Sequence, residues 1–312
     1  DTSAQVDYGV ALPHLHLKYK PFEWLDFRAS YSTTLARPDF NYIVPATEIN
    51  RGGDVTISQG NANLQAAVST NYDFFVTAFS GKWGLLSAGV FYKDIENAFY
   101  PQIVGINNDS IAAVLGLGDA NVGGGVLTTY QNSPQSYVRG FEVELQTNLN
   151  FLPGALKGLV FNVNYTRLNS ETTINSFRRE VIIRPPIIRR VVIPFQREAA
   201  LIGQAKDILN MSLGYDYKRS FSARVSASYQ GDKLSGYSDG PSKDRFNQGF
   251  WRFDAVLKYK FKTGLNIFLN LNNLSNQKDI NFYTQLGDRF TTSVTRYGPT
   301  ATVGAEFKFS NE

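Results

Sequence analysis

Hydrophobic and polar residues alternate strictly in three runs near the C-terminal end of the chain. Leucine and isoleucine oppose asparagine in 265–272, and the runs 251–261 and 301–309 have the same period of two. Successive side chains of a β-strand leave opposite faces of the pleat, so this period predicts strands. Each strand then has one aliphatic and aromatic face and one charged or amide face. The apolar face can pack against a protein core while the polar face meets water. Alternatively, the apolar face can contact lipid while the polar face lines a water-filled lumen.

The same reading of the whole chain predicts about eleven strands, with boundaries good to roughly two to four residues. The predicted spans are 6–19, 22–36, 70–81, 84–98, 137–150, 157–170, 206–218, 220–235, 248–262, 263–275 and 299–310. These strands are longer than the about 5–6 residues of a typical soluble strand. They satisfy the about 9–11 residues that a strand needs to cross the hydrocarbon of a membrane.

Short and long connections alternate without a break between the predicted strands. The short ones are tight turns, while the long ones cover 37–69, 99–136, 171–205, 236–247 and 276–298. A meander that crosses a membrane gives this pattern, with short turns on the periplasmic side and long loops outside. A soluble sandwich also alternates apolar and polar positions, but it has no reason to place every long loop at one end.

Composition narrows the class of protein further. The 312 residues include no cysteine, so disulfide and thiol chemistry are absent, and the net charge of +4 does not argue for nucleic acid. No apolar run approaches the roughly 18–20 residues of a membrane helix. The 23 phenylalanines and 17 tyrosines suit strands and the aromatic girdles of membrane barrels. No catalytic motif stands out, so we expect no enzymatic activity and no cofactor.

An arginine-rich segment in the connection 171–205 is the most unusual local feature. Isoleucine and valine separate its arginines, and a Pro-Pro pair stiffens the middle. The predicted contacts to a ligand or partner protein are Arg178, Arg179, Arg184, Arg189 and Arg190. Arginine forks pair with carboxylate and phosphate groups. The alternative is a hairpin whose arginines meet lipopolysaccharide phosphates or solvent.

Charged residues on the polar faces of the strands are predicted to line a barrel lumen. They are Glu142, Glu144, Arg224, Arg252, Asp254, Lys258 and Glu306. His14 and His16, the only histidines, share a strand face, but no third ligand is in view. We therefore expect no metal site, and solvated histidines instead.

An ordered set of motifs over nearly the whole chain resembles the C-terminal half of a TonB-dependent outer-membrane receptor, of the kind common in Bacteroidetes. The motifs are TLARPDF at 34–40, GNANL at 60–64 with TNYD at 70–73, AGVFYKDIEN at 88–97, VRGFE at 138–142 with FLPG at 151–154, LNLNNLSN at 269–276 and YGP at 297–299. The chain departs from the family at Ala62, where proline is frequent, and after Phe309, where family barrels often end.

The resemblance implies an all-β fold: a transmembrane antiparallel up-and-down barrel of about 22 strands filled by a plug. Residues 1–312 then form a single partial domain, with about half of the strands and no plug. Implied partners are membrane lipid and lipopolysaccharide, the N-terminal barrel half and plug, the TonB complex through the plug region, and a surface lipoprotein lid. The implied function is active uptake of a glycan, peptide or metal chelate across the outer membrane. The alternatives are a passive or scaffold barrel, and a soluble β-rich binding protein.

Overall fold

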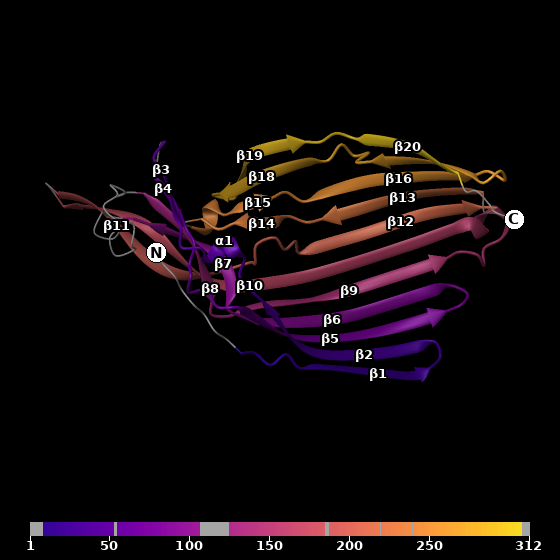
Figure 1. Cartoon of the computed structure of the whole chain (residues 1–312), viewed down its shortest axis with the longest axis horizontal. Helices are drawn as coiled ribbons and strands as arrows, with labels where there is room; N and C mark the ends of the chain where they lie inside the picture. The colour runs from indigo at the N-terminus through magenta and orange to yellow at the C-terminus, as the bar shows by residue number, and fades with distance from the viewer. Residues whose placement is uncertain are drawn as a thin grey trace.

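The computed structural model describes residues 9–52, 55–106, 125–184, 187–218, 220–238 and 240–307. Eleven strands in chain order form an antiparallel main sheet, drawn as a fan in Figure 1, and β11 pairs with β10 beside it. The main-sheet strands are β1 His14–Phe22, β2 Leu25–Ala36, β5 Ala67–Ser80, β6 Gly84–Glu96, β9 Ser136–Asn148, β10 Leu159–Arg184, β12 Asp207–Tyr217, β13 Phe221–Gln230, β16 Phe250–Lys260, β17 Leu265–Asn272 and β20 Thr300–Phe307. The predicted all-β meander of eleven strands is thereby confirmed.

The long connections are not the loops that the sequence predicts. They contain β3 Thr47–Asn50, β4 Thr56–Gln59, β7 Ala98–Gly105, β8 Val126–Ser133, β11 Ile187–Ala199, β14 Lys233–Gly236, β15 Arg245–Asn247, β18 Lys278–Gln285 and β19 Asp288–Arg296. Three short helical segments accompany them or the turns: α1 Phe40–Ile43, η1 Gly154–Gly158 and η2 Pro241–Lys243. Four of these strands, β3, β4, β14 and β15, have only three or four residues, too few for a period of two to register in the sequence.

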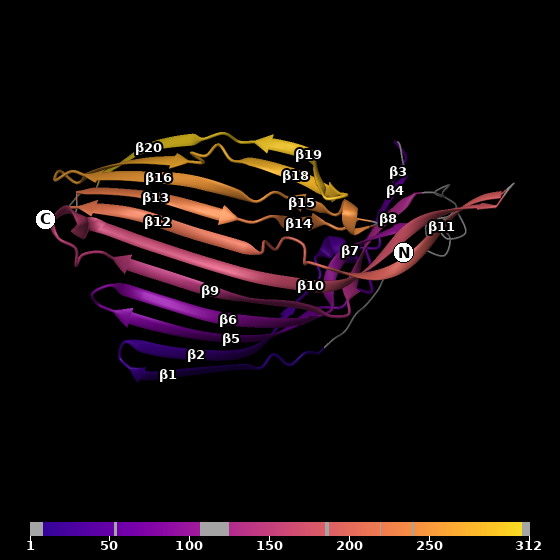
Figure 2. The ribbon, with the colours of Figure 1, turned by 180° about the vertical axis from the view of Figure 1, so that it is seen from behind.

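All the tight turns of the main sheet lie at one end, and all the long connections lie at the other (Figure 1). The reverse view in Figure 2 shows the same separation. The structured long connections form two further sheets, with strand orders β3-β4-β8-β7 and β14-β15-β18-β19. We call these two sheets, together with the β10–β11 hairpin beyond Thr172, the upper assembly.

The main sheet has one apolar and one polar face, because directly opposite residues in neighbouring strands project to the same side. One apolar row crosses four strands through Val225, Ala255, Leu271 and Ala301. Side chains of this face are not covered by the chain: Leu213 is 52% exposed and Val225 51%. Apolar residues exposed over a whole sheet require an apolar medium or a partner.

Aromatic rings lie over glycines on the polar face. A Cβ atom added to Gly89 would collide with the ring of Phe75, and one added to Gly304 would collide with the ring of Phe268. The missing side chains leave room for the rings to lie along the sheet, a known device for covering glycine in a strand. This packing explains why Phe75 and Phe268 occupy positions that alternation assigns to polar residues.

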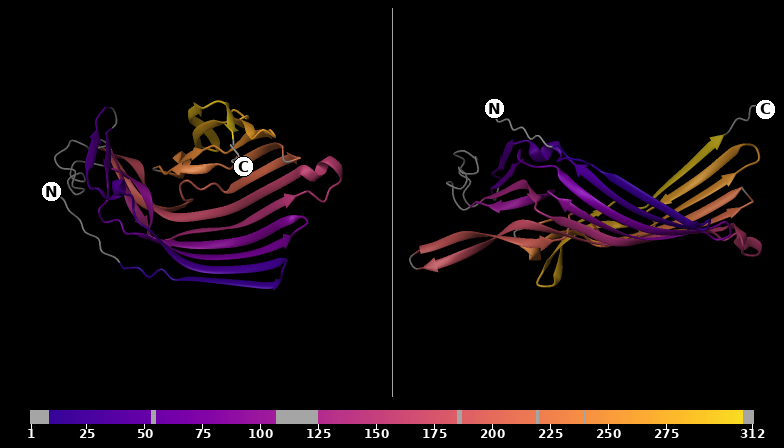
Figure 3. Two further views of the ribbon diagram at one scale, coloured as in Figure 1. Left: turned by 45° about the vertical axis from the view of Figure 1, so that its right-hand side comes forward. Right: turned by 90° about the horizontal axis from the view of Figure 1, so that it is seen from below.

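The main sheet does not close on itself among the described residues, since β1 and β20 stand at its two ends. Figure 3 shows the sheet twisted and curved between these edges. The described part of the chain contains no helix that is long and apolar enough to cross a membrane.

Candidate functional site

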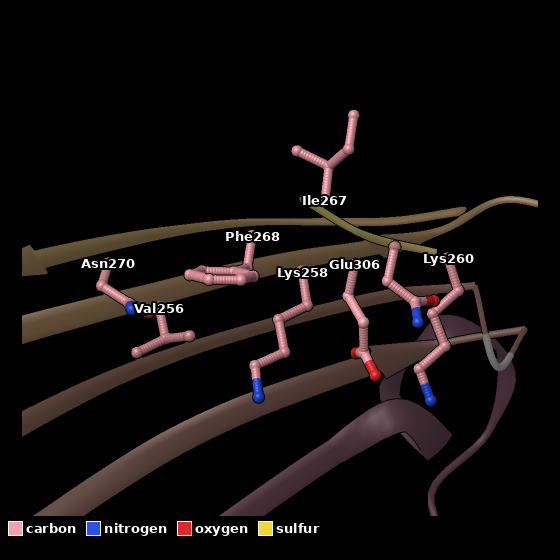
Figure 4. Close-up of a pocket in the computed structure, with 8 residues that line it drawn as sticks. Val256, Lys258, Lys260, Ile267, Phe268, Asn270 and Glu306 are labelled. Carbon is pink, nitrogen blue, oxygen red and sulfur yellow. The ribbon is translucent and has the colours of Figure 1, made fainter. Parts of the chain in front are cut away.

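A hollow of about 560 Å³ lies on the polar face, where β16, β17 and β20 meet. Its lining comprises Val256, Lys258, Lys260, Asn266, Ile267, Phe268, Asn270 and Glu306. Figure 4 shows the side chains of Lys258, Lys260 and Glu306 pointing to the same side, while Ile267 points away from them. Register explains the grouping, because Lys260 is opposite Asn266, which is opposite Glu306. The hollow thus offers ammonium, amide and carboxylate groups at one place.

The seven residues predicted to face a lumen all project from the polar face. One row of opposite residues joins Glu144 to Asn164, Asn210, Ser228 and Arg252 across five strands. The structure does not gather the seven into one cluster, however. Glu142 and Glu144 lie on β9, Arg224 on β13, Arg252, Asp254 and Lys258 on β16, and Glu306 on β20.

Several of these charges are held by near neighbours. Asn164 Nδ2 donates to Glu142 Oε1 at 2.6 Å, and Arg252 Nε lies 3.3 Å from Asp254 Oδ2. The backbone N–H of Asn273 donates to the other oxygen of Asp254 at 2.8 Å. Asn273 has a positive φ of 56°, as amide residues at tight bends often do. Asp254 therefore stabilises the bend that follows β17, in addition to lying on the polar face.

The root of the upper assembly is a hydrophobic cluster that sequence reasoning did not predict. Tyr100, Ile174, Leu234 and Tyr237 are each at most 4% exposed and come from three different long connections. The hydroxyl of Tyr237 donates to the carbonyl of Ala200 at 2.8 Å. Burial raises the pKa of the Tyr100 and Tyr237 hydroxyls, so both stay protonated well into the alkaline range.

A bidentate ion pair beside this cluster joins β11 to the segment that follows η2. Arg197 Nη1 donates to Asp244 Oδ2 at 2.8 Å and Nη2 to Oδ1 at 2.6 Å. The two side chains are only 9% and 7% exposed. Asp244 Oδ1 also accepts the backbone N–H of Ser238 at 2.9 Å. No local signal could have predicted this pair, because 47 positions separate its members.

The other upper sheet has a core of its own. Ile57, Ile106 and Leu127 are at most 2% exposed, and Val104 packs against them. Here β4 and β8 pair in parallel, with Thr56 opposite Val126, so two separate long connections share one sheet. The upper assembly is therefore built from packed β-structure in which distant connections hold one another.

The arginine-rich segment forms the outer part of the β10–β11 hairpin. Arg178 Nε lies 2.9 Å from Glu180 Oε1, and both side chains are exposed. The side chains of the other four predicted contacts, Arg179, Arg184, Arg189 and Arg190, lie outside the described residues, although their backbones belong to β10 and β11. Register pairs Arg178 with Ile193 and Ile182 with Arg189. The arginines are therefore spread along the hairpin.

The two histidines lie on β1 opposite serines, with His14 paired to Ser32 and His16 to Ser30. Ser30 Oγ in turn donates to Asp73 Oδ2 at 3.0 Å. In the part of the chain that the structure describes, no group of three or more histidine, aspartate or glutamate side chains could hold a metal ion.

A meander with one exposed apolar face, one polar face and all its long connections at one end defines the class of transmembrane antiparallel β-barrels. The particular family follows from comparison with known proteins. The family model described as TonB dependent receptor-like, beta-barrel matches residues 1–274, and the chain belongs to this family.

Solved structures with the same fold are receptors and a transporter of low sequence identity to this chain. The ferric enterobactin receptor PfeA of Pseudomonas aeruginosa, solved with enterobactin, gives a TM-score of 0.61 at 14% identity over 94% of this chain. The siderophore receptor PirA of Acinetobacter baumannii gives 0.54 at 13% identity over 86% of the chain, and the FrpB iron transporter of Neisseria meningitidis 0.53 at 15% over 96%. The chain spans 40%, 37% and 39% of these structures, respectively. No curated protein sequence matches the chain.

Proposed function

We propose that this chain is the C-terminal part of an outer-membrane transporter that takes up a nutrient by TonB-dependent active transport. The apolar face of the main sheet contacts lipid, and the polar face lines the lumen. The upper assembly stands outside the cell and carries the ligand-binding surface. The observation that carries the proposal is the exposed apolar face on strands whose long connections all lie at one end.

The two free edges of the main sheet need partner strands. Unpaired N–H and C=O groups facing hydrocarbon would destabilise the protein by several kcal/mol each. We infer that β1 and β20 pair with further barrel strands of the same polypeptide, or of another chain. A plug domain would then occupy the lumen next to the hollow at Lys258 and Glu306, and it would carry the contact to TonB.

The nutrient belongs to one of three classes: glycans, peptides or metal chelates. The solved neighbours include receptors named for siderophores, and metal chelates are therefore the first class to test. Chelates and anionic glycans both offer carboxylate or hydroxyl oxygens that arginine and amide groups bind. We propose no enzymatic activity, because the family consists of receptors and transporters.

Growth of the organism that makes the protein tests the proposal. Cells lacking the gene are supplied with ferric siderophores as the iron source, oligosaccharides as the carbon source or peptides as the nitrogen source. We expect a growth defect on one panel, which the restored gene corrects only when TonB is present. Correction that is equal without TonB would contradict active transport and support the passive barrel instead.

A substitution on the apolar face tests the lipid contact directly. Leu213 lies at the middle of β12, and its replacement in Leu213→Arg should destabilise the folded barrel by about 2–4 kcal/mol, since a charge near the bilayer midplane loses its hydration. Asn210→Arg on the same strand projects from the polar face and is the matched control, expected to change stability little. Folding into lipid vesicles, followed by urea titration, measures both. Equal losses in the two variants would contradict the assignment of faces.

A further inference from the structure

The tip of the β10–β11 hairpin carries the whole charge surplus of the chain. The tip comprises residues 178–184 and 187–193, and the segment 178–193 contains five arginines and one acidic residue. Its surplus of +4 equals the formal net charge of all 312 residues. The rest of the protein is therefore neutral overall. Such concentration of one sign at one element marks an electrostatic contact surface.

Apolar side chains accompany these charges and are not covered by the protein. Val181 is 57% exposed, Ile182 41% and Ile183 65%. Register places Val181 opposite Arg190 and Ile182 opposite Arg189, so aliphatic and cationic positions stand side by side across the two strands. A hairpin of two strands alone is marginally stable in water. The tip therefore presents apolar area whose burial against a partner would be favourable.

The root of the same hairpin is held firmly by the rest of the upper assembly. Phe177 is 4% exposed, and its ring lies so close to Gly105 of β7 that a Cβ atom there would come within 2.8 Å. Tyr100 Oη accepts the backbone N–H of Asn175 at 2.9 Å, and Arg197 is paired with Asp244. Among the side chains of β10 that the structure describes, Phe177 is the last buried one, one residue before the arginine-rich tip. Figures 1 and 3 show the hairpin extending past the rest of the upper assembly.

The height of the hairpin tip above the membrane indicates which kind of partner the tip can contact. Tyr165 is the last partly exposed aromatic residue that β10 carries on its apolar face, since the later Phe177 is buried in the upper assembly, and Arg178 follows 13 residues after Tyr165. At about 3.3 Å per residue this distance is about 40 Å along the strand. A strand tilt of about 40° still places the tip roughly 30 Å above the apolar band. The headgroup region extends only about 5–8 Å beyond the hydrocarbon on each side of the bilayer, so the tip lies well above it.

We propose that the tip of the β10–β11 hairpin is the docking arm for a second protein with an acidic surface around an apolar patch. The inference deepens the proposed function and depends on its outward orientation of the upper assembly. Arginine next to exposed aliphatic side chains is the composition that protein interfaces favour. The braced root limits the directions in which the hairpin can point, which lowers the entropy lost on binding.

The test uses the full-length protein in its native outer membrane. A photo-crosslinking amino acid is placed at position 183, and the control carries it at position 286, where Leu286 is 97% exposed in the β18–β19 turn. We expect position 183, and not position 286, to capture one surface protein. That protein is then identified, purified and titrated against the detergent-solubilised transporter.

The binding measurements decide the outcome. The double variant Arg178→Glu with Arg190→Glu should weaken binding at least about tenfold, and added salt should weaken it further. Arg178→Gln with Arg190→Gln removes the charges without reversing them and should weaken binding less, which separates the loss of charge from misfolding of the hairpin. Lys157→Glu in η1, at the opposite end of the main sheet, is the control for charge reversal and should not change binding. Capture of lipopolysaccharide alone, capture of nothing, or binding that ignores the charge reversal would each overturn the proposal.

One further measurement separates this inference from the proposed function. A cysteine at position 183 should react with a membrane-impermeant label added to intact cells. An unlabelled cysteine would contradict the outward orientation, and with it the proposed function. Labelling without a protein partner would leave that orientation standing and refute the docking arm alone.

Discussion

Gly84→Val is expected to prevent or severely weaken folding of the barrel. Gly84 begins β6 with a φ of +111°, which side chains with a Cβ atom rarely adopt. A Cβ atom there would also collide with the carbonyl oxygen of Gln146 in β9, a backbone atom that cannot turn aside. Strain and overpacking each contribute about 1–3 kcal/mol, so a combined loss of about 3 kcal/mol or more is expected.

The control for this variant lies three residues away in the same turn. A Cβ atom at Gly81 would meet nothing within 4 Å, so Gly81→Val should fold like the parent protein. Heat-modifiable mobility on gels reports the folded fraction of each full-length variant, and thermal unfolding in detergent reports the stability. If Gly84→Val folded as well as Gly81→Val, the close approach of β6 and β9 at this turn would be wrong.

Asp244→Ala is expected to loosen the upper assembly without unfolding the barrel. The substitution leaves the guanidinium of Arg197 buried without its carboxylate, and breaking a buried pair in this way destabilises by about 3–5 kcal/mol. It also removes the acceptor for the N–H of Ser238. Hydrogen exchange should speed up in 172–199 and 233–247, while exchange in β12 and β13 stays slow.

Two further variants serve as controls for Asp244→Ala. Glu180→Ala breaks the exposed pair with Arg178, which is worth about 0–1 kcal/mol, so exchange at the root of the hairpin should not change. The double variant Arg197→Met with Asp244→Leu removes both charges and should restore much of the protection, because no buried charge is left unpaired. Unchanged exchange in Asp244→Ala would mean that the ion pair does not hold the upper assembly together.

The candidate site was predictable only in part. Alternation placed Glu144, Arg252 and Glu306 on polar strand faces, and the register agrees that they share one face. Sequence alone could not place Lys260 and Asn266 beside Glu306, because these residues belong to three strands whose register only the folded sheet defines. The lumen lining and the ligand contacts of the arginine-rich segment stay predictions.

The sequence by itself determined the period-two strands, their order, and the alternation of tight turns with long connections. These features depend on neighbouring residues, since a strand shows its two faces within a few positions. The tertiary structure alone decided what the long connections become. The Arg197–Asp244 pair, the parallel pairing of β4 with β8 and the cluster around Tyr100 join residues tens of positions apart. Such contacts require the main sheet to bring the connections to one end, so no local pattern encodes them.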